Sequence, residues 1–278
     1  MQYKLLALDL DGTLLDPNEL ITPRVRTAVR QAVESGCLVT LATGRRLRPA
    51  RQFAHQLGLK LPLILYSGGI IFDTQTETAL YHRPIPRAFL QRAIELIPTE
   101  LGLGLLQSPV QGEYIWFGPP EYDSAFQRDY ASDPIRADLV KRCAFTDLYK
   151  VEDVLTITSI GPADNIIPLT QKVRGGLECN LYGYTLRHPS LKDMHGFDLL
   201  PLTNTKAHAL RWLAAHFDIN LSQTMVVGDG SNDLEMFEVV GLGVAMGNAI
   251  AEVKARAGAI VASNRADGVA EAIERFIL

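Results

Sequence analysis

The sequence lacks a strong charge of either sign, long apolar runs and paired cysteines, and each absence narrows what the chain can do. The formal net charge is −4 over 278 residues, so neither nucleic acid nor an acidic membrane surface is an expected partner. No apolar stretch approaches the ~20 residues that cross a bilayer, and the N-terminal residues do not have the pattern of a signal peptide. The oligomeric state is left open.

Cysteine is scarce as well. The chain has three, Cys37, Cys143 and Cys179, with wide spacings and no Cys-x-x-Cys pair. A zinc ribbon or a disulfide framework is therefore not expected. We expect three buried, reduced thiols, which fit a cytoplasmic protein.

Short apolar runs alternate with helical patterns at both ends of the chain. Toward the N-terminus, strands are expected over 4–8, 38–42 and 61–66, and helices over 49–57 and from Pro23, with Thr22 as its N-cap. Toward the C-terminus, strands over 225–228, 242–246 and 259–261 alternate with helices over 206–217, 234–239 and from residue 268. This alternation predicts parallel βαβ units and a doubly wound, Rossmann-like α/β core.

The middle of the chain has a different pattern. Seven prolines fall between residues 84 and 134, and they separate an expected helix over 89–97 from strands over 114–117 and 154–160 that have alternating faces. We therefore predict two domains. Residues 1–82 and 199–278 form the parallel core, and residues 83–198 form an inserted α+β domain.

The first motif that indicates chemistry is Asp9-Leu10-Asp11-Gly12-Thr13-Leu14, directly after a buried strand. Two carboxylates leave that strand together, and their charges are costly to bury unpaired, so we expect a cation beside Asp9 and Asp11. The simpler alternative is a turn whose aspartates cap a helix. The length of the string favours a functional site.

Three further motifs follow other expected strands or open a helix: Thr43-Gly44, Lys206, and the string over 228–233, Gly-Asp-Gly-Ser-Asn-Asp. A hydroxyl and a free N–H at a helix entrance suit an anion, and carboxylates suit Mg²⁺. Each motif also has a simpler interpretation. Thr43-Gly44 could merely mark the end of a strand, Lys206 could be a solvated surface lysine, and the string over 228–233 could be a hairpin or a calcium-like loop. Their common position favours function, because ligands bind beyond the carboxyl ends of parallel strands.

These four motifs, in this order, resemble those of the haloacid dehalogenase (HAD) superfamily of phosphatases. The strings over 244–249 and 267–270 resemble its Cof-type branch, subfamily IIB. The resemblance implies a Mg²⁺-dependent phosphatase that acts on a small phosphorylated metabolite, with sugar phosphates as the first expectation. A phosphotransferase or phosphomutase with the same chemistry is one alternative, and a non-catalytic regulatory protein with the same fold is another.

The resemblance also implies roles for individual residues. Asp9 is expected to be the nucleophile that forms an aspartyl phosphate, and Asp11 the general acid/base. Thr43 and Lys206 complete the catalytic set. Mg²⁺ is expected between Asp9, Asp11 (through its backbone carbonyl) and Asp229, with Asp233 supporting the site from behind. The expected phosphate-binding residues are Leu10, Thr43, Gly44, Lys206 and Asn232.

Two features bear on specificity. The Cof-type branch usually has Asn-Gly-Ala after the third strand, where this chain has Ser67-Gly68-Gly69, so an asparagine contact with substrate is lost here. Only eleven residues lie between Asp11 and Pro23, too few for a domain. The insert over 83–198 is therefore expected to be a lid of the type called a C2 cap, which selects the substrate.

Overall fold

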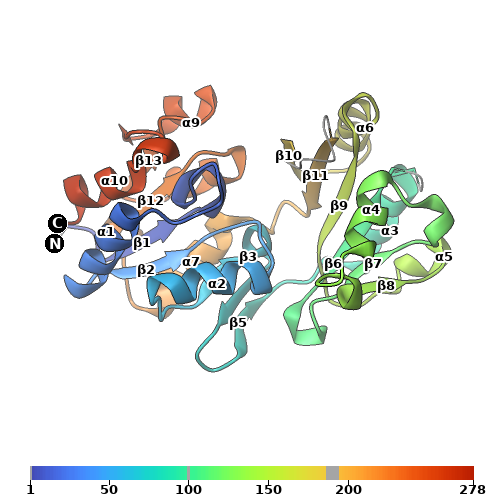
Figure 1. Cartoon of the computed structure of the whole chain (residues 1–278), viewed down its shortest axis with the longest axis horizontal. Coiled ribbons are helices and arrows are strands. Elements are labelled where there is room, and N and C mark those ends of the chain that lie inside the picture. The colour runs from blue at the N-terminus through green and yellow to red at the C-terminus, as the bar shows by residue number, and fades with distance from the viewer. Residues whose placement is uncertain (1, 99–100, 186–193) are drawn as a thin grey trace. The chain divides into compact units, whose positions relative to one another are not determined.

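Figure 1 shows the computed structural model, which describes residues 2–98, 101–185 and 194–278. The chain forms two compact units. The first consists of Met1–His82 and Thr205–Leu278, and the second of Arg83–Asn204. The first unit is therefore built from both ends of the chain.

A five-stranded sheet forms the centre of the first unit. Its order is β14 (Ala259–Ile260), β13 (Leu242–Ala245), β12 (Thr224–Gly228), β1 (Leu5–Leu8) and β2 (Leu38–Leu41), and all neighbours are parallel. The chain moves outward from β1 to β2, and later from β12 through β13 to β14 in the other direction. The strand order thus reverses between β1 and β12, which is where open α/β sheets bind ligands.

The core strands are apolar because they are buried. All four residues of β1 and all five of β12 are buried, as expected of parallel strands between helices. Helix α1 (Pro23–Glu34) packs against α10 (Gly268–Phe276), and α7 (Lys206–His216) packs against α8 (Leu234–Phe237). Two further helices are α2 (Leu47–Leu57) and α9 (Ala251–Arg256). The predicted α/β core is confirmed, as is the cap of α1, where the Thr22 hydroxyl accepts a hydrogen bond from the Val25 N–H.

An antiparallel extension follows the core strands. Strands β3 (Leu63–Leu65), β4 (Ile70–Asp73) and β5 (Thr78–His82) form a three-stranded sheet, which a bridge between Ala42 and Ile64 joins to β2. The sequence analysis assigned no strand to β4 or β5. The apolar part of β4 is too short to show a period, and β5 is mostly half-buried at the edge of the sheet.

The second unit contains a six-stranded sheet in the order β10 (Asn180–Thr185), β11 (Met194–Leu200), β9 (Val154–Pro162), β6 (Leu103–Gln107), β7 (Ile115–Phe117) and β8 (Val140–Arg142). Helices α3 (Arg87–Leu96), α4 (Ala125–Ser132), α5 (Phe145–Leu148) and α6 (Ala163–Gly176) accompany it. The expectation that 154–160 has alternating faces is wrong. Strand β9 is buried at every residue except Pro162, because it lies inside the sheet and contacts both α4 and α6.

All three cysteines are free thiols, as expected, but only Cys37 is buried, while Cys143 and Cys179 are partly exposed. Within the described residues, no helix combines the length and the apolar character that crossing a lipid bilayer requires.

Candidate active site

Three neighbouring strands bring the sequence motifs together. Leu8, the last residue of β1, is in register with Val227 of β12 and Leu41 of β2. Asp9 therefore comes level with Gly228, the residue before Asp229, and its N–H donates to the Val227 carbonyl at 3.1 Å. The two aspartates, which are 220 positions apart in the sequence, meet because parallel strands present their carboxyl ends on one edge.

A tight turn over Leu10–Leu14 packs the first motif against the fourth. Gly12 has a φ of +78°, and a Cβ there would lie 2.3 Å from Oδ2 of Asp229. The Thr13 hydroxyl donates to Oδ1 of Asp229 at 2.9 Å. Glycine is therefore required at position 12 both by its backbone conformation and by the closeness of Asp229.

Lys206 is a buried cation between two carboxylates. Its side chain is 0% exposed, and Nζ lies 2.6 Å from Oδ1 of Asp9 and 2.8 Å from Oδ1 of Asp233. It is the first residue of α7, whose N-cap Thr205 accepts a hydrogen bond from the His208 N–H. The plain reading of Lys206 as a solvated lysine is wrong, because α7 begins at the carboxyl end of the sheet and directs this side chain inward.

Both carboxylate oxygens of Asp233 accept hydrogen bonds from other residues of the site. While Oδ1 accepts from Lys206, Oδ2 accepts the N–H groups of Asp229 and Gly230, both at 3.1 Å. Asp233 is completely buried. It therefore fixes both the lysine and the loop that holds Asp229.

The charges of the cluster do not balance. Burial raises the pKa of Asp9 well above its usual value, more strongly than Lys206 lowers it, and the charges of Asp233 and Asp229 raise it further. Burial and then Asp233 raise the pKa of Asp229 to about 6. Burial disfavours the charged form of Lys206, but Asp233 and Asp9 outweigh this effect and keep its pKa above the usual value. Three carboxylates thus face one lysine, and a further cation would relieve the repulsion.

The donor set fits a hard divalent cation. Asp9, Asp229 and Asp233 each place a carboxylate oxygen within 4.8 Å of the others. Both oxygens of Asp233 are already engaged, whereas Oδ2 of Asp9 accepts no hydrogen bond from the described residues. Among the residues that the structure describes, Oδ2 of Asp229 is bonded only by the Asn248 amide, at 3.5 Å. Carboxylate oxygens of this kind are typical Mg²⁺ ligands, so Asp9 and Asp229 are the residues that fit the metal.

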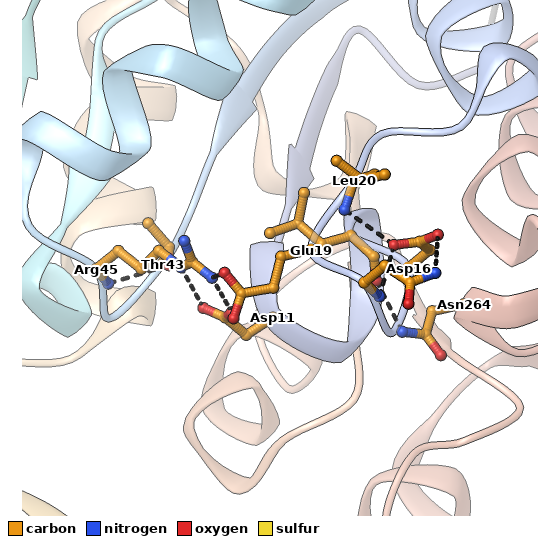
Figure 2. Close-up of polar contacts among 9 residues, drawn as sticks. Asp11, Asp16, Glu19, Leu20, Thr43, Arg45 and Asn264 are labelled. Atoms are coloured by element: carbon orange, nitrogen blue, oxygen red, sulfur yellow. Dashed lines mark hydrogen bonds and ion pairs between the residues drawn. The ribbon is translucent and has the colours of Figure 1, made fainter. Parts of the chain in front are cut away.

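The Asp11 side chain is directed elsewhere. Figure 2 shows its carboxylate in a two-pronged pair with Arg45, with Nε 2.8 Å from Oδ2 and Nη2 2.6 Å from Oδ1. The same guanidinium lies 3.4 Å from Glu19. The side chain of Asp11 does not belong to the carboxylate cluster, so only its backbone carbonyl is left for the expected metal contact. Arg45 received no role in the sequence analysis, although it follows Thr43-Gly44 directly.

A fixed loop presents Glu19 to Arg45. Asp16 accepts hydrogen bonds from the N–H groups of Asn18 and Leu20 at 2.8 and 2.9 Å, and Asn264 donates to the Leu15 carbonyl at 2.7 Å (Figure 2). Glu19 itself has a φ of +60°. The arrangement gives Arg45 two carboxylate partners, Asp11 and Glu19, whose side chains are both largely exposed.

The expected phosphate-binding residues lie around the same strand ends. Thr43 is completely buried, and its hydroxyl oxygen accepts the Arg45 N–H at 3.1 Å, which leaves its proton free to be donated. The Leu10 side chain is completely buried, so Leu10 can serve only through its backbone. Asn232 is partly exposed in the loop after β12. Gly44 lies beside Ser67, for which the sequence predicts no role in binding phosphate.

Comparisons with known proteins agree with this architecture. The family model of the haloacid dehalogenase-like hydrolases matches residues 6–273. The chain is 30% identical to the 5-amino-6-(5-phospho-D-ribitylamino)uracil phosphatase YcsE of Bacillus subtilis (strain 168), with 100% of this chain and 97% of that protein covered. It is 26% identical to the pyridoxal phosphate phosphatase YbhA of Escherichia coli (strain K12), with both chains covered completely.

Solved structures give the same picture. A haloacid dehalogenase-like hydrolase from Bacteroides thetaiotaomicron superimposes with a TM-score of 0.74 at 28% identity, covering 98% of this chain and 99% of that one. A sugar phosphatase of HAD subclass IIB shares the fold, with a TM-score of 0.78 at 22% identity over 99% of this chain and 100% of that one. The order of the four motifs, their meeting at one sheet edge and the match over nearly the whole chain lead to one conclusion: the chain belongs to the haloacid dehalogenase-like hydrolase family.

Proposed function

We propose that this chain is a Mg²⁺-dependent phosphatase that hydrolyses a small phosphomonoester through an aspartyl phosphate on Asp9. The observation that carries the proposal is the state of the Asp9 carboxylate. Lys206 holds one of its oxygens at 2.6 Å, and the other accepts no hydrogen bond from the described residues, at the point where the strand order reverses. A carboxylate fixed on one side and open on the other is suited to nucleophilic attack.

The surrounding charges prepare Asp9 for this role. Lys206 favours the ionised, nucleophilic form of Asp9, while Asp233 keeps Lys206 in place. A divalent cation held by Asp9 and Asp229 would supply positive charge to the phosphate oxygens. Without a second cation, burial and the neighbouring carboxylates favour the protonated, inert form of Asp9.

The reaction then takes two steps. Asp9 attacks phosphorus in line with the ester bond, that bond breaks, and Asp11 gives a proton to the departing alkoxide. Asp11 next takes a proton from water, which attacks the aspartyl phosphate and releases inorganic phosphate. Because Arg45 holds the Asp11 carboxylate in the structure, Asp11 has to leave this pair to transfer a proton.

Donors around Asp9 stabilise the charge that spreads over the phosphate oxygens during transfer. The Thr43 hydroxyl, the Gly44 N–H, Lys206 and the Asn232 amide are the candidates, since they lie on the strand ends and loops next to Asp9. Preorganised donors of this kind are typically the largest contribution to phosphoryl transfer.

The substrate class follows from the relatives. YcsE and YbhA are named for the phosphoesters of a ribityl compound and of pyridoxal, both small metabolites. We therefore propose a small phosphorylated metabolite, with sugar phosphates tested first. A phosphomutase or phosphotransferase would differ from a phosphatase only in the molecule that accepts the phosphoryl group. Trapping the aspartyl phosphate and testing whether water or a second metabolite discharges it distinguishes the two activities.

The test is a panel of metabolite phosphates assayed with Mg²⁺ for the wild type and for Asp9→Asn. We expect the substitution to lower kcat by a factor of about 10⁴ or more, because loss of a covalent nucleophile removes the pathway itself. Asp73→Asn is the matched control, since Asp73 caps an exposed turn of the same unit through the Gln75 N–H, and it should keep full activity. An Asp9→Asn protein with wild-type turnover would refute the proposal.

A further inference from the structure

Ser67 is a mostly buried polar residue beside the Thr43–Gly44 turn, and its hydroxyl has no hydrogen-bond partner among the described residues. It is 3% exposed, and its hydroxyl forms no hydrogen bond with any other described residue. Its oxygen lies 3.1 Å from the position that a Cβ on Gly44 would take. The hydroxyl is not one of the fully buried side-chain atoms that lack a partner, so it is accessible from outside the protein and a ligand can bind to it.

The backbone around Ser67 is strained in a way that fixes this position. Tyr66, Ser67 and Gly68 have successive φ values of +51°, +52° and +98°, and the first two are conformations that residues with a side chain rarely adopt. The Tyr66 N–H donates to the Arg45 carbonyl at 3.2 Å, and the Ser67 N–H donates to the Thr43 carbonyl at 3.0 Å. The loop is thereby attached to the whole turn over 43–45.

The same loop is also attached to the start of α7. A Cβ on Gly68 would lie 2.1 Å from the carbonyl oxygen of Thr205 and 2.8 Å from the N of Lys206. Only glycine allows this approach. Ser67 is therefore held between the Thr43–Gly44 turn and the helix that supplies Lys206, the two elements that the proposed function assigns to the phosphate.

Gly44 provides the space for the Ser67 hydroxyl. Its backbone conformation does not require glycine, because its φ lies outside the left-handed region. A side chain at position 44 would instead press on the Ser67 oxygen. The pairing of Gly44 with Ser67 thus keeps a hydroxyl next to the Gly44 N–H.

We propose that the Ser67 hydroxyl is a further phosphate-binding group, which donates a hydrogen bond to an oxygen of the phosphoryl group beside the Gly44 N–H. The inference rests on the proposed function, because it takes this edge of the sheet as the phosphate site. It assigns to serine a contact at a position where the branch usually has asparagine. It also accounts for a loop whose left-handed backbone holds an accessible hydroxyl against the Thr43–Gly44 turn.

The test measures the binding of inorganic phosphate by calorimetry in the presence of MgCl₂, for the wild type and Ser67→Ala. We expect about 10- to 100-fold weaker binding in the variant, the usual effect of losing one hydrogen bond to a charged group. Because the contact exists before and during phosphoryl transfer, KM should rise while kcat changes little. Alanine and serine incur a similar cost at a positive φ, so the melting temperature should remain close to that of the wild type.

Two further variants make the result specific. Thr224→Val removes a fully buried hydroxyl that has no partner among the described residues, at the start of β12 and thus at the opposite end of the sheet, and it should bind phosphate like the wild type. Ser67→Asn restores a donor with a residue that tolerates a positive φ, and it should bind more tightly than Ser67→Ala.

Phosphate binding by Ser67→Ala within about twofold of the wild type would overturn the inference. An equal loss in Thr224→Val would overturn it as well. These results differ from a failure of the proposed function, in which the wild type itself neither binds phosphate nor hydrolyses any phosphoester.

Discussion

Replacing Lys206 by methionine tests the electrostatic core of this protein. Methionine keeps the length and the apolar stem of the side chain but removes the ammonium group that lies 2.6 Å from Asp9 and 2.8 Å from Asp233. Both carboxylates are then left buried without their cation. Since the lysine side chain is 0% exposed, solvent cannot replace the lost charge.

The structure sets the size of the expected effect. Removing one partner of a buried, hydrogen-bonded ion pair typically costs about 3–5 kcal/mol, because the remaining charge stays desolvated. For a unit of this size, 1 kcal/mol corresponds to about 2–4 °C in melting temperature, so we expect a decrease of about 10 °C. The reference is the metal-free protein, in which no added cation compensates for the loss.

The effect should depend on pH in one direction. Burial already raises the pKa of Asp9, and Lys206 is the charge that lowers it, so the substitution raises this pKa further. The folded state of the variant then binds more protons than the unfolded state, and its stability falls as the pH rises. The deficit relative to the wild type should therefore be largest at about pH 8 and smaller at about pH 5.

The assay is thermal unfolding of the metal-free proteins at both pH values, followed by circular dichroism. Lys60→Met is the control, because Lys60 is exposed in the same unit and its loss should move the melting temperature by no more than about 2 °C. A Lys206→Met protein that melts like the wild type at both pH values would refute the view that Lys206 compensates two buried charges.

Three other predictions follow from the geometry. Asp198→Asn should raise the melting temperature at about pH 8 and have little effect at about pH 4. Burial raises the pKa of Asp198 to about 7, so the folded wild type holds a proton that the unfolded chain has lost, and its stability falls as the pH rises from about 4 to about 8. Equal shifts in melting temperature at the two pH values would contradict this. Asp11→Asn should lower kcat for alkyl phosphates about 10- to 100-fold more than for p-nitrophenyl phosphate, whose leaving group needs no proton, because Asp11 is the proposed general acid; equal losses would show that Asp11 does not protonate the leaving group. Gly12→Ala should raise the Mg²⁺ concentration for half-maximal activity about tenfold or more, because its Cβ would press on Oδ2 of Asp229; an unchanged Mg²⁺ dependence in a folded variant would argue against Asp229 as a ligand.

Much of the core could be predicted from local signals. The apolar run before Asp9 can only be a strand buried on both faces, and Thr22-Pro23 marks a helix start because a capping hydroxyl is followed by a residue that lacks an N–H. Strands that alternate with helices then require parallel pairing, and parallel pairing places the strand ends on one edge. By this route the sequence alone predicts that Asp9 and Asp229 come together.

The direction of each polar side chain was decided only by the tertiary structure. The sequence spacing of Asp9 and Asp11 does not reveal where their carboxylates point. In the structure Asp9 pairs with Lys206 and Asp11 with Arg45, because each carboxylate pairs with the cation that folding brings nearest to it. The burial of Lys206 depends on where α7 begins relative to β1, a relation between segments about 200 positions apart. The position of the Ser67 hydroxyl likewise results from a left-handed turn that contacts at Thr43 and Thr205 hold in place. Local sequence determines which residues reach the edge of the sheet, whereas the choice of partners there depends on distances that only the packed chain defines.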